Sequence, residues 1–486
     1  MRWDVGCPEA TSDDQVGHRG QQATLPRNLR TVLPALLLAG GMLWGQVEPA
    51  APAPDAEPAK AAPADKATGE KATSGRATAE KAAGDLAPQV RKLVRELDAA
   101  EKSRRDAAEE QLLKLGPAAL SLLPEGDQTS AEVELRLARI RNRLEQAQGE
   151  ASVQASSITL AGDALSLADV IASFEKQSGD KLIDFREQFK QQAAEKTLKL
   201  DLAKTPFWPA LDQMLDQAGM TIYPYSGEAG LALVNRSSNE APRYKRGSYS
   251  GAFRFEAMEI TARRDLRSPQ PPQLSLQMQV AWEPRLAPIV LLQPADAVLA
   301  IDDQGKPLTL SGPESEPEIP INPDASAVDL TVAFNAPERS ATRIASLHGK
   351  LNAVLPGPIT TFRFDKLGPS AKGQKRQGGA TVVLEQVRRN NLVWEVRMRL
   401  VFDKAGRALE SHRTWVLRNE AYLESPDKKT IRYAGLETTR QAENEVGVAY
   451  LFDVEGDLKD HTFVYKTPTA IIQVSLEYDL KDIPLP

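Results

Sequence analysis

SLADVIASFEKQSGDKLIDF, residues 166–185, and TPFWPALDQMLDQAGMTIYP, residues 205–224, follow one pattern and decide how the middle of the chain folds. In each stretch a capping residue precedes an apolar stripe at helical spacing, and a glycine followed by an apolar run ends the stretch. The matching stripe positions are Leu167, Ile171 and Phe174 in the first stretch and Phe207, Leu211 and Met214 in the second. The sequence therefore predicts two copies of a helix–strand unit.

Each predicted helix follows a predicted strand. Residues 158–160 form a short apolar run before the first helix, and Leu198, Leu200 and Leu202 alternate with polar residues before the second. Alternation with a period of two is typical of a half-buried strand. The order strand–helix–strand–strand–helix–strand predicts an α+β module over residues 156–238.

This order, together with ALSLADVIASFEKQSG and LKLDLAKTPFWPALDQMLDQAGMTI, resembles the secretin and TonB short N-terminal domain over residues 156–236. The resemblance implies a small periplasmic module that docks onto another envelope component or contacts a ligand. The downstream sequence departs from secretins and TonB-dependent receptors, so a channel function is not carried over.

The apolar period changes to two from Tyr244 to the end of the chain. LSLQMQVAW, residues 274–282, and VWEVRMRLVF, residues 393–402, alternate apolar and polar side chains as strands of antiparallel sheets do. We expect two antiparallel immunoglobulin-like β-sandwiches, over residues 244–367 and 380–486, separated by the glycine-rich basic linker GPSAKGQKRQGG. The predicted fold class is multidomain and mainly β, with the α+β module before the sandwiches.

The N-terminal part predicts export. LPRNLRTVLPALLLAGGMLWGQ, residues 25–46, has two arginines before an apolar run of signal-peptide length, so residues 1–45 are predicted to be an extension and a signal peptide. Residues 46–85 are almost wholly small, charged or proline residues, and they predict a disordered linker. We expect a bacterial protein of the periplasm or the extracellular space, with no transmembrane span in the mature chain.

Residues 86–150 predict a helical hairpin extended by a third helix. The segment LVRELDAAEKSRRDAAEEQLLKLGPAALSLLP, residues 93–124, resembles a single HEAT-like repeat. A solenoid needs about three repeats to bury a continuous core. A helical hairpin is therefore the plainer interpretation.

Composition excludes several classes of chemistry. The 486 residues carry a formal charge of −6, which does not indicate binding to nucleic acid. The single cysteine, Cys7, precedes the predicted signal, so the mature chain has no cysteine for a disulfide, a metal site or a thiol nucleophile.

The motifs that resemble catalytic sites are incomplete. Gly368 and Gly373 have the spacing of a phosphate-binding loop, but Gln374 stands where the lysine is required. His412 and His461 are expected on strands, without an obvious point of convergence, and a metal centre needs several ligands that converge. We therefore expect no catalytic, cofactor-binding or metal-binding residues, and no enzyme activity.

Aromatic residues offer two kinds of binding surface. The tryptophans on apolar stripes could form a glycan-binding platform, but core packing is favoured: Trp282, Trp394 and Trp415. Trp208 lies beside Pro209 and off its helix stripe, so an exposed Trp208 would be a contact for a partner. The predicted partner contacts are Trp208, Tyr223 and Tyr225.

These patterns predict an exported, non-catalytic protein of the cell envelope that acts as a docking or scaffold module. Its partners are expected to be envelope proteins, bound by addition of a strand to an open sheet edge. The alternative is a β-sandwich protein that binds carbohydrate or peptidoglycan. A metal-dependent hydrolase is the third class.

Overall fold

The computed structural model describes residues 86–486 except residues 125–129, 193–195, 229, 268, 312–316, 323 and 411. The signal peptide and the linker predicted over residues 1–85 lie outside the described residues. Within the described part of the chain, no helix has both the length and the apolar character that a membrane span requires.

Helices form the N-terminal part of the described chain. Its elements are a helix over residues 86–96, α2 (Lys102–Lys114), the 3-10 helix η1 (Pro117–Leu122) and α3 (Ala131–Ser152). Their apolar stripes pack into one cluster, in which Leu97, Leu112 and Ile140 are fully buried. The hairpin and the third helix are where the periodicity predicts them.

The α+β module, residues 157–235, has the six elements in the predicted order, followed by one further strand. Its elements are β1 (Ser157–Leu165), α4 (Leu167–Ser178), β2 (Leu182–Asp184), β3 (Leu198–Pro206), α5 (Phe207–Ala218), β4 (Met220–Tyr223) and β5 (Leu231–Asn235). The hydroxyl of Ser166 accepts the backbone N–H of Asp169 and caps α4. Gly179 and Gly219 end the helices with φ of 79° and 69°, a conformation that favours glycine.

The module contains two small sheets. β1 pairs antiparallel with β3, and the other sheet has the order β2-β5-β4, with β2 parallel to β5. Both helices pack their apolar stripes into the same cluster, where Phe174 and Phe207 meet edge to face.

The next part of the chain forms a first sheet pair around one apolar cluster. One sheet has the order β13-β8-β7-β6, with β6 (Ser248–Ser250), β7 (Phe253–Arg263), β8 (Gln273–Trp282) and β13 (Ala327–Asn335). The other follows β11-β10-β14-β9-β12, with β24 paired to β14, and contains β9 (Val290–Leu292), β10 (Leu299–Asp302), β11 (Pro307–Leu308), β12 (Glu318–Pro320), β14 (Arg343–Pro356) and β24 (Ile471–Pro484). The predicted inward residues of β8, from Leu274 to Trp282, are all buried.

A second sheet pair encloses a separate cluster. One sheet has the order β15-β23-β19-β20, with β15 (Ile359–Asp365), β19 (Ala421–Glu424), β20 (Thr430–Arg432) and β23 (Thr462–Pro468). The other has the order β16-β17-β18-β22-β21, with β16 (Gly373–Gln377), β17 (Ala380–Asn390), β18 (Val393–Phe402), β21 (Gly435–Ala442) and β22 (Glu445–Phe452). The chain is thus mainly β, with antiparallel sheets after the module.

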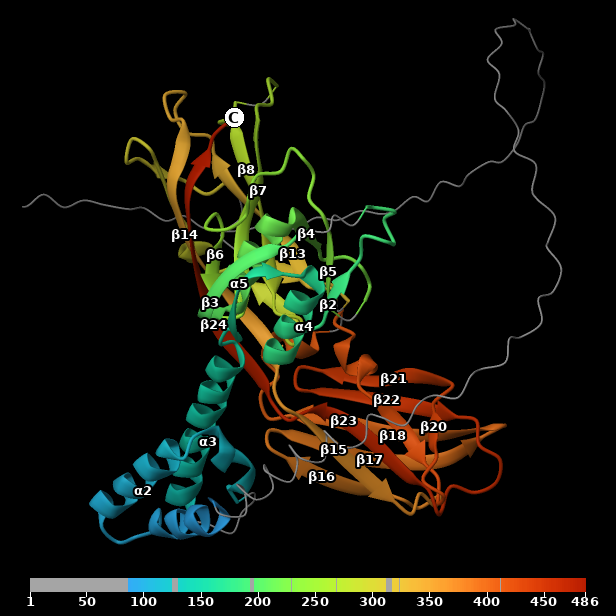
Figure 1. Ribbon diagram of the computed structural model, residues 1–486. Coiled ribbons are helices and arrows are strands. Elements are labelled where there is room, and N and C mark those ends of the chain that lie inside the picture. The colour runs from blue at the N-terminus through green and yellow to red at the C-terminus, as the bar shows by residue number, and fades with distance from the viewer. Residues whose placement is uncertain are drawn as a thin grey trace, which may run out of the picture. The chain divides into compact units, whose positions relative to one another are not determined.

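The boundary predicted between the sheet pairs is wrong at two places. β24 was expected with residues 380–486, but it pairs with β14 from Arg343 opposite Pro484 to Pro356 opposite Ile471, and the two strands lie side by side (Figure 1). The residues predicted as a linker, 368–379, contain β16, which pairs with β17. The second sheet pair is therefore inserted between β14 and β24.

The reason for this error is that a strand's alternation does not reveal its partner. Residues 471–478 alternate in the same way whichever sheet they join. The chain crosses between the sheet pairs at two adjacent places, where the Gly357 N–H bonds to the Ala470 carbonyl at 2.8 Å and the Thr469 N–H bonds to the Pro358 carbonyl at 2.9 Å.

We expect Tyr478→Ala to loosen the first sheet pair and leave the second unchanged. Tyr478 is buried and stacks on Phe255 with ring centroids 5.0 Å apart, so truncation should lower the free energy of unfolding by about 3 kcal/mol. Hydrogen exchange should then increase in β7, β8 and β14. The matched variant is Tyr450→Ala, in the second cluster, which should loosen β18 and β22 instead. Faster exchange in β17 and β18 of the Tyr478→Ala protein would contradict the assignment of β24.

Candidate binding cleft

The α+β module packs on the outer face of the sheet β13-β8-β7-β6, and Trp208 lies at this contact. Its side chain is only 1% exposed, and its Nε1–H donates to the Ala252 carbonyl at 2.9 Å. The prediction of an exposed Trp208 is therefore wrong. Trp208 does lie off the apolar stripe of α5. The sheet that contains β6 and β7 covers this side of the helix too, so the side chain is buried.

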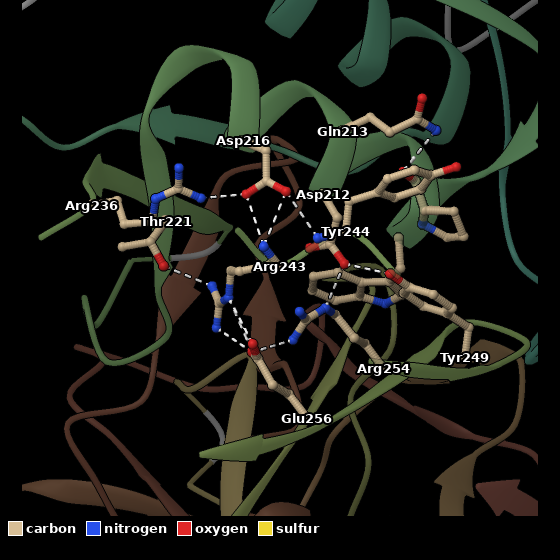
Figure 2. Close-up of polar contacts among 12 residues, drawn as sticks. Asp212, Gln213, Asp216, Thr221, Arg236, Arg243, Tyr244, Tyr249, Arg254 and Glu256 are labelled. Carbon is tan, nitrogen blue, oxygen red and sulfur yellow. Dashed lines mark hydrogen bonds and ion pairs between the residues drawn. The ribbon is translucent and has the colours of Figure 1, made fainter. Parts of the chain in front are cut away.

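Arg254 links the module to the sheet through a buried ion triad (Figure 2). Its Nε lies 2.9 Å from Asp212 Oδ2 on α5, and its Nη1 lies 2.6 Å from Glu256 Oε2 on the same strand, β7. Arg254 and Asp212 are each 1% exposed. Tyr249 of β6 adds a hydrogen bond from its hydroxyl to Asp212 Oδ2 at 2.6 Å. A buried charge is tolerated only when it is paired, so these contacts fix α5 against β7.

The network continues into residues 236–247, which connect the module to β6. Arg243 Nη2 lies 2.6 Å from Glu256 Oε2, and its Nη1 donates to Thr221 Oγ1 on β4 at 2.7 Å. The carboxylate of Asp216 on α5 accepts the backbone N–H of Arg243 at 2.9 Å and also pairs with Arg236 (Figure 2). Residues 236–247 are therefore held both to the module and to β7.

The two arginines of this network, Arg254 and Arg243, keep the Glu256 carboxylate ionised. Burial alone would raise the pKa of Glu256, but Arg254 and Arg243 outweigh burial and lower that pKa to about 2. Burial also opposes the charge on Arg254, whose pKa is nevertheless raised by Asp212 and Glu256. A carboxylate with so low a pKa carries no proton to donate near neutral pH, so Glu256 is suited to anchoring and unsuited to general acid catalysis.

A cleft of about 1330 Å³ lies beside the network. Its walls come from β4 and β5 of the module, from residues 236–247, from β7 and β8, and from the end of β24. Apolar side chains such as Ile222, Ile260 and Leu276 line it together with polar ones. Gln279 is one of the lining residues; it is 7% exposed, and its Oε1 has no hydrogen-bond partner.

The edge of β7 opens into this cleft. β6 pairs with β7 only from Ser250 opposite Phe253 to Ser248 opposite Phe255. On that edge, residues 256–263 have no strand partner among the described residues. Met258 is 49% exposed there and lines the cleft, and a β-bulge between Ala257 and Glu259 bends the strand.

The edge of β24 faces the same space. The backbone N–H groups of Glu477 and Asp479 donate to the hydroxyls of Ser250 and Ser248 of β6, at 3.3 and 2.9 Å. Residues 480–484 extend beyond β6 and line the cleft. In the described part of the chain, only β14 forms a ladder with β24.

Tyr223 and Tyr225, two predicted partner contacts, lie close together. Tyr223 is half-buried and lines the cleft, while Tyr225 is 48% exposed and its ring centroid lies 6.4 Å from that of Tyr223. Phe189, which the sequence did not single out, is 47% exposed and continues the row at 5.1 Å from Tyr223. The row borders the cleft and is accessible to a partner.

The tryptophans do not form a glycan platform. Trp282 and Trp394 are 2% and 6% exposed and belong to different clusters, which confirms core packing for both. Trp415 is half-buried against Phe402, and its Nε1–H donates to the Ala408 carbonyl.

The histidines are placed differently from the prediction. ESHRTWVL, residues 410–417, was expected to be a strand, but it lies between and within the helical turns η3 (Gly406–Leu409) and η4 (Trp415–Arg418). His412 is exposed on this segment. His461 precedes β23, and its Nδ1 is buried without a partner. The two are not part of one ligand group among the described residues.

His412 does approach two carboxylates. Its ligand atom and those of Glu318 and Glu410 all lie within 4.8 Å of one another. However, Arg413 Nη2 lies 2.6 Å from Glu318 Oε2, while Arg407 pairs with Glu318 and lies 3.0 Å from Glu410. Because two guanidinium groups already neutralise the carboxylates and would repel a cation, this group is better explained as an ion-pair cluster.

The sequence analysis missed the ion triad, because Asp212 lies 42 residues before Arg254 and the two meet only in the folded protein. Asp212 stands between the stripe residues Leu211 and Met214, and Arg254 and Glu256 alternate with buried phenylalanines on β7. An acidic residue on a mostly buried helix was the signal that a basic partner had to exist.

A second polar contact joins the module to the sheet. Asp180, which is 1% exposed, accepts the backbone N–H of Arg285 at 2.6 Å, and Arg285 Nε lies 2.7 Å from the fully buried Glu283. Burial raises the pKa of Asp180 to about 6; the Arg285 N–H opposes this shift and Glu283 adds to it.

We expect Arg254→Met to lower the free energy of unfolding by about 3 kcal/mol, because it leaves the buried Asp212 without its cationic partner and Glu256 with Arg243 alone. The loss should shrink in acid. The lowered pKa of Glu256 contributes stability above pH 4.5, and this is lost as the pH falls towards 2. Lys199→Met, which removes an exposed ion pair with Asp163, is the control and should have no measurable effect. Equal denaturation midpoints for the two variants would show that the triad contributes nothing.

We expect Asp180→Asn to change how stability depends on pH. Because the folded pKa is raised, the carboxyl's contribution is present below about pH 4 and is lost as the pH rises through about 6. The free energy of unfolding of the wild type minus that of the variant should therefore fall across this range, by at most about 3 kcal/mol. Urea denaturation at several pH values measures it, with the exposed Asp163→Asn as the control. Parallel curves for the wild type and Asp180→Asn would refute the shift.

Comparison with known proteins assigns no family to the chain. No family model matches it, and neither a curated protein nor a solved structure matches it. Its function is therefore inferred from the geometry of the described residues.

Proposed function

We propose that this chain is an exported, non-catalytic protein of the cell envelope that docks onto a partner protein by binding an extended segment of it in the cleft. The observation that carries the proposal is the edge of β7, whose residues 256–260 line the cleft and have no strand partner on that edge among the described residues. Unpaired N–H and C=O groups of a sheet edge bind another extended chain through main-chain hydrogen bonds.

The edge is protected against unselective pairing. The bulge between Ala257 and Glu259 bends it, and the exposed charges of Glu259 and Arg263 lie on the same strand. Natural proteins use bulges and charges to prevent edge-to-edge aggregation. An edge that is bent, charged and recessed in a cleft supports selective binding of a suitable segment.

The surroundings of the cleft support docking in preference to chemistry. The triad of Asp212, Arg254 and Glu256 holds the walls in place before a partner arrives, which lowers the cost of binding. The resemblance of residues 156–236 to the secretin and TonB short N-terminal domain stays a prediction, and it points in the same direction. In this proposal the two sheet pairs are immunoglobulin-like sandwiches, and export follows from the sequence of residues 25–46.

We expect a photo-crosslinking phenylalanine analogue at Met258 of the full chain to join the protein to one segment of one envelope protein. The same analogue at Leu392, which is 81% exposed on the far hairpin between β17 and β18, is the matched control and should not. Mass spectrometry of envelopes from the source organism locates the joined peptides.

Ala241→Trp supplies a second control, because Ala241 is exposed and lines the cleft, so a tryptophan there would obstruct part of it. The Met258 product should disappear in this variant. Products that persist in Ala241→Trp, or that Leu392 forms equally, would show that the cleft is not the docking site.

A further inference from the structure

We infer that the tip of the hairpin formed by β7 and β8, residues 263–267, binds the surface of a lipid bilayer that carries anionic headgroups. In this inference Leu266 enters the headgroup region, and the arginines beside it contact the phosphates of the lipids. The inference goes beyond the proposed function and does not depend on the cleft. It names a lipid surface as a second partner of the protein.

The tip projects from the first sheet pair. β7 and β8 pair as far as Arg263 opposite Gln273, at the end of the sheet pair where the chain also terminates, marked C (Figure 1). All residues from Arg263 to Arg267 are exposed. The N–H of Ala336 donates to the Pro272 carbonyl at 2.8 Å and holds the base of the hairpin to a neighbouring connection. A tip of this kind can touch a flat surface.

Leu266 is the apolar part of the tip. It is 89% exposed, the highest value among the exposed large hydrophobic residues of the described chain. A single exposed leucine is common on protein surfaces and by itself indicates no partner. Its position among arginines at the end of a hairpin is what indicates a surface with a charged layer over an apolar interior.

The charge of the tip is positive. Arg263 and Arg264 form no ion pair or side-chain hydrogen bond among the described residues, and Arg267 pairs only with Asp265 of the same tip, at 3.5 Å. Arg339, in the connection between β13 and β14, is exposed and likewise has no ion pair within the described part of the chain. A free guanidinium group is well suited to binding phosphate.

Acidic residues in the connections at the same end of the sheet pair do not cancel this charge. Glu338 lies 2.8 Å from Lys306, and Asp482 lies 3.3 Å from Arg343, so each of these carboxylates is already paired with a cation. The arginines of the tip therefore leave an excess of positive charge beside Leu266. Basic residues near an anionic bilayer each add to binding, and their effect falls off within a Debye length.

A bilayer fits the tip better than an acidic protein does. A protein partner would need a hollow of matching shape for a projecting leucine surrounded by guanidinium groups. A bilayer accepts this arrangement anywhere on its surface, because the acyl chains lie beneath the anionic headgroups and long arginine side chains keep their charge at the surface. Nucleic acid is disfavoured, because residues 263–267 contain no aromatic side chain on which bases could stack.

Binding at the tip brings the open edge of β7 close to the bilayer. Ile260 lines the cleft and precedes Arg263 by three residues, which is about 10 Å along an extended strand. A partner segment in the cleft would therefore lie close to the headgroups.

A local fluorescence readout tests the inference in the full chain. The protein carries Cys7→Ser and Leu266→Cys, labelled with an environment-sensitive dye. The matched control carries Cys7→Ser and Leu392→Cys, labelled in the same way at an 81% exposed position on the hairpin between β17 and β18. The dye must report locally, because the predicted signal sequence could by itself bring the full chain to a membrane.

We expect vesicles of phosphatidylcholine mixed with phosphatidylglycerol to shift the emission of the dye at position 266 to shorter wavelength. A nitroxide on the acyl chains should quench that dye. The dye at position 392 should show neither effect, and vesicles of phosphatidylcholine alone should produce neither effect at either position.

The contribution of charge is tested by Arg263→Ser and Arg264→Ser together in the labelled Leu266→Cys protein. Each arginine near an anionic surface contributes about fivefold, so the lipid concentration at half-maximal shift should rise about 25-fold. The control for net charge is Arg91→Ser with Arg95→Ser, at two exposed positions of the first described helix, and it should change this concentration little.

Several results would overturn the inference: no shift at position 266, equal shifts at positions 266 and 392, an equal shift with phosphatidylcholine alone, or no loss of affinity in the double arginine variant. An equal response to soluble polyglutamate would also overturn it and would assign the tip to an acidic protein. None of these results affects the crosslink at Met258, which tests the proposed function separately.

Discussion

The buried guanidinium of Arg254 is the constraint on which the arrangement of this protein depends. It lies between the carboxylates of Asp212 and Glu256, and each of the three is stable inside the protein only because the others are present. Asp212 belongs to the module and the other two to β7, so the requirement for charge pairing sets where the module lies on the sheet. Apolar contacts, such as those of Ala281 and Ala327 with the module's cluster, add free energy but are less directional.

That placement creates the cleft. With the module fixed over the outer face of β7 and β8, the connecting residues 236–247 reach β6 from the side and are held there by Arg243 and Asp216. β6 is short, and β7 continues beyond it along the cleft. The insertion of the second sheet pair has a related effect, since it makes the last strand of the chain a wall of the first sheet pair.

The spacing of apolar residues predicted the helices and strands well, but it did not predict which strands pair with each other. The helices of the module, their glycine ends and the inward residues of β8 follow from spacing alone, because period and capping are properties of neighbouring residues. The membership of β24, the strand β16 and the burial of Trp208 depend on which distant surface covers them, and no local signal carries that information. For the candidate site, the sequence singled out Tyr223, which lines the cleft, and Tyr225 beside it, and their role as partner contacts stays a prediction. The ion triad was missed, because Asp212 and Arg254 are 42 positions apart in the sequence.

The energetics of strand binding explain why the open edge of β7 needs more than main-chain hydrogen bonds to hold a partner segment. Ordering the backbone of one residue costs about 1–2 kcal/mol, and each main-chain hydrogen bond returns about 1 kcal/mol net. A segment bonded along the edge of β7 therefore gains little from its main chain alone. The balance is then decided by side chains buried on the core face, at about 1.5–3 kcal/mol for each large aliphatic residue. In the proposed docking mode selectivity thus comes from side chains, because the main chain alone leaves no surplus with which an unsuitable segment could bind.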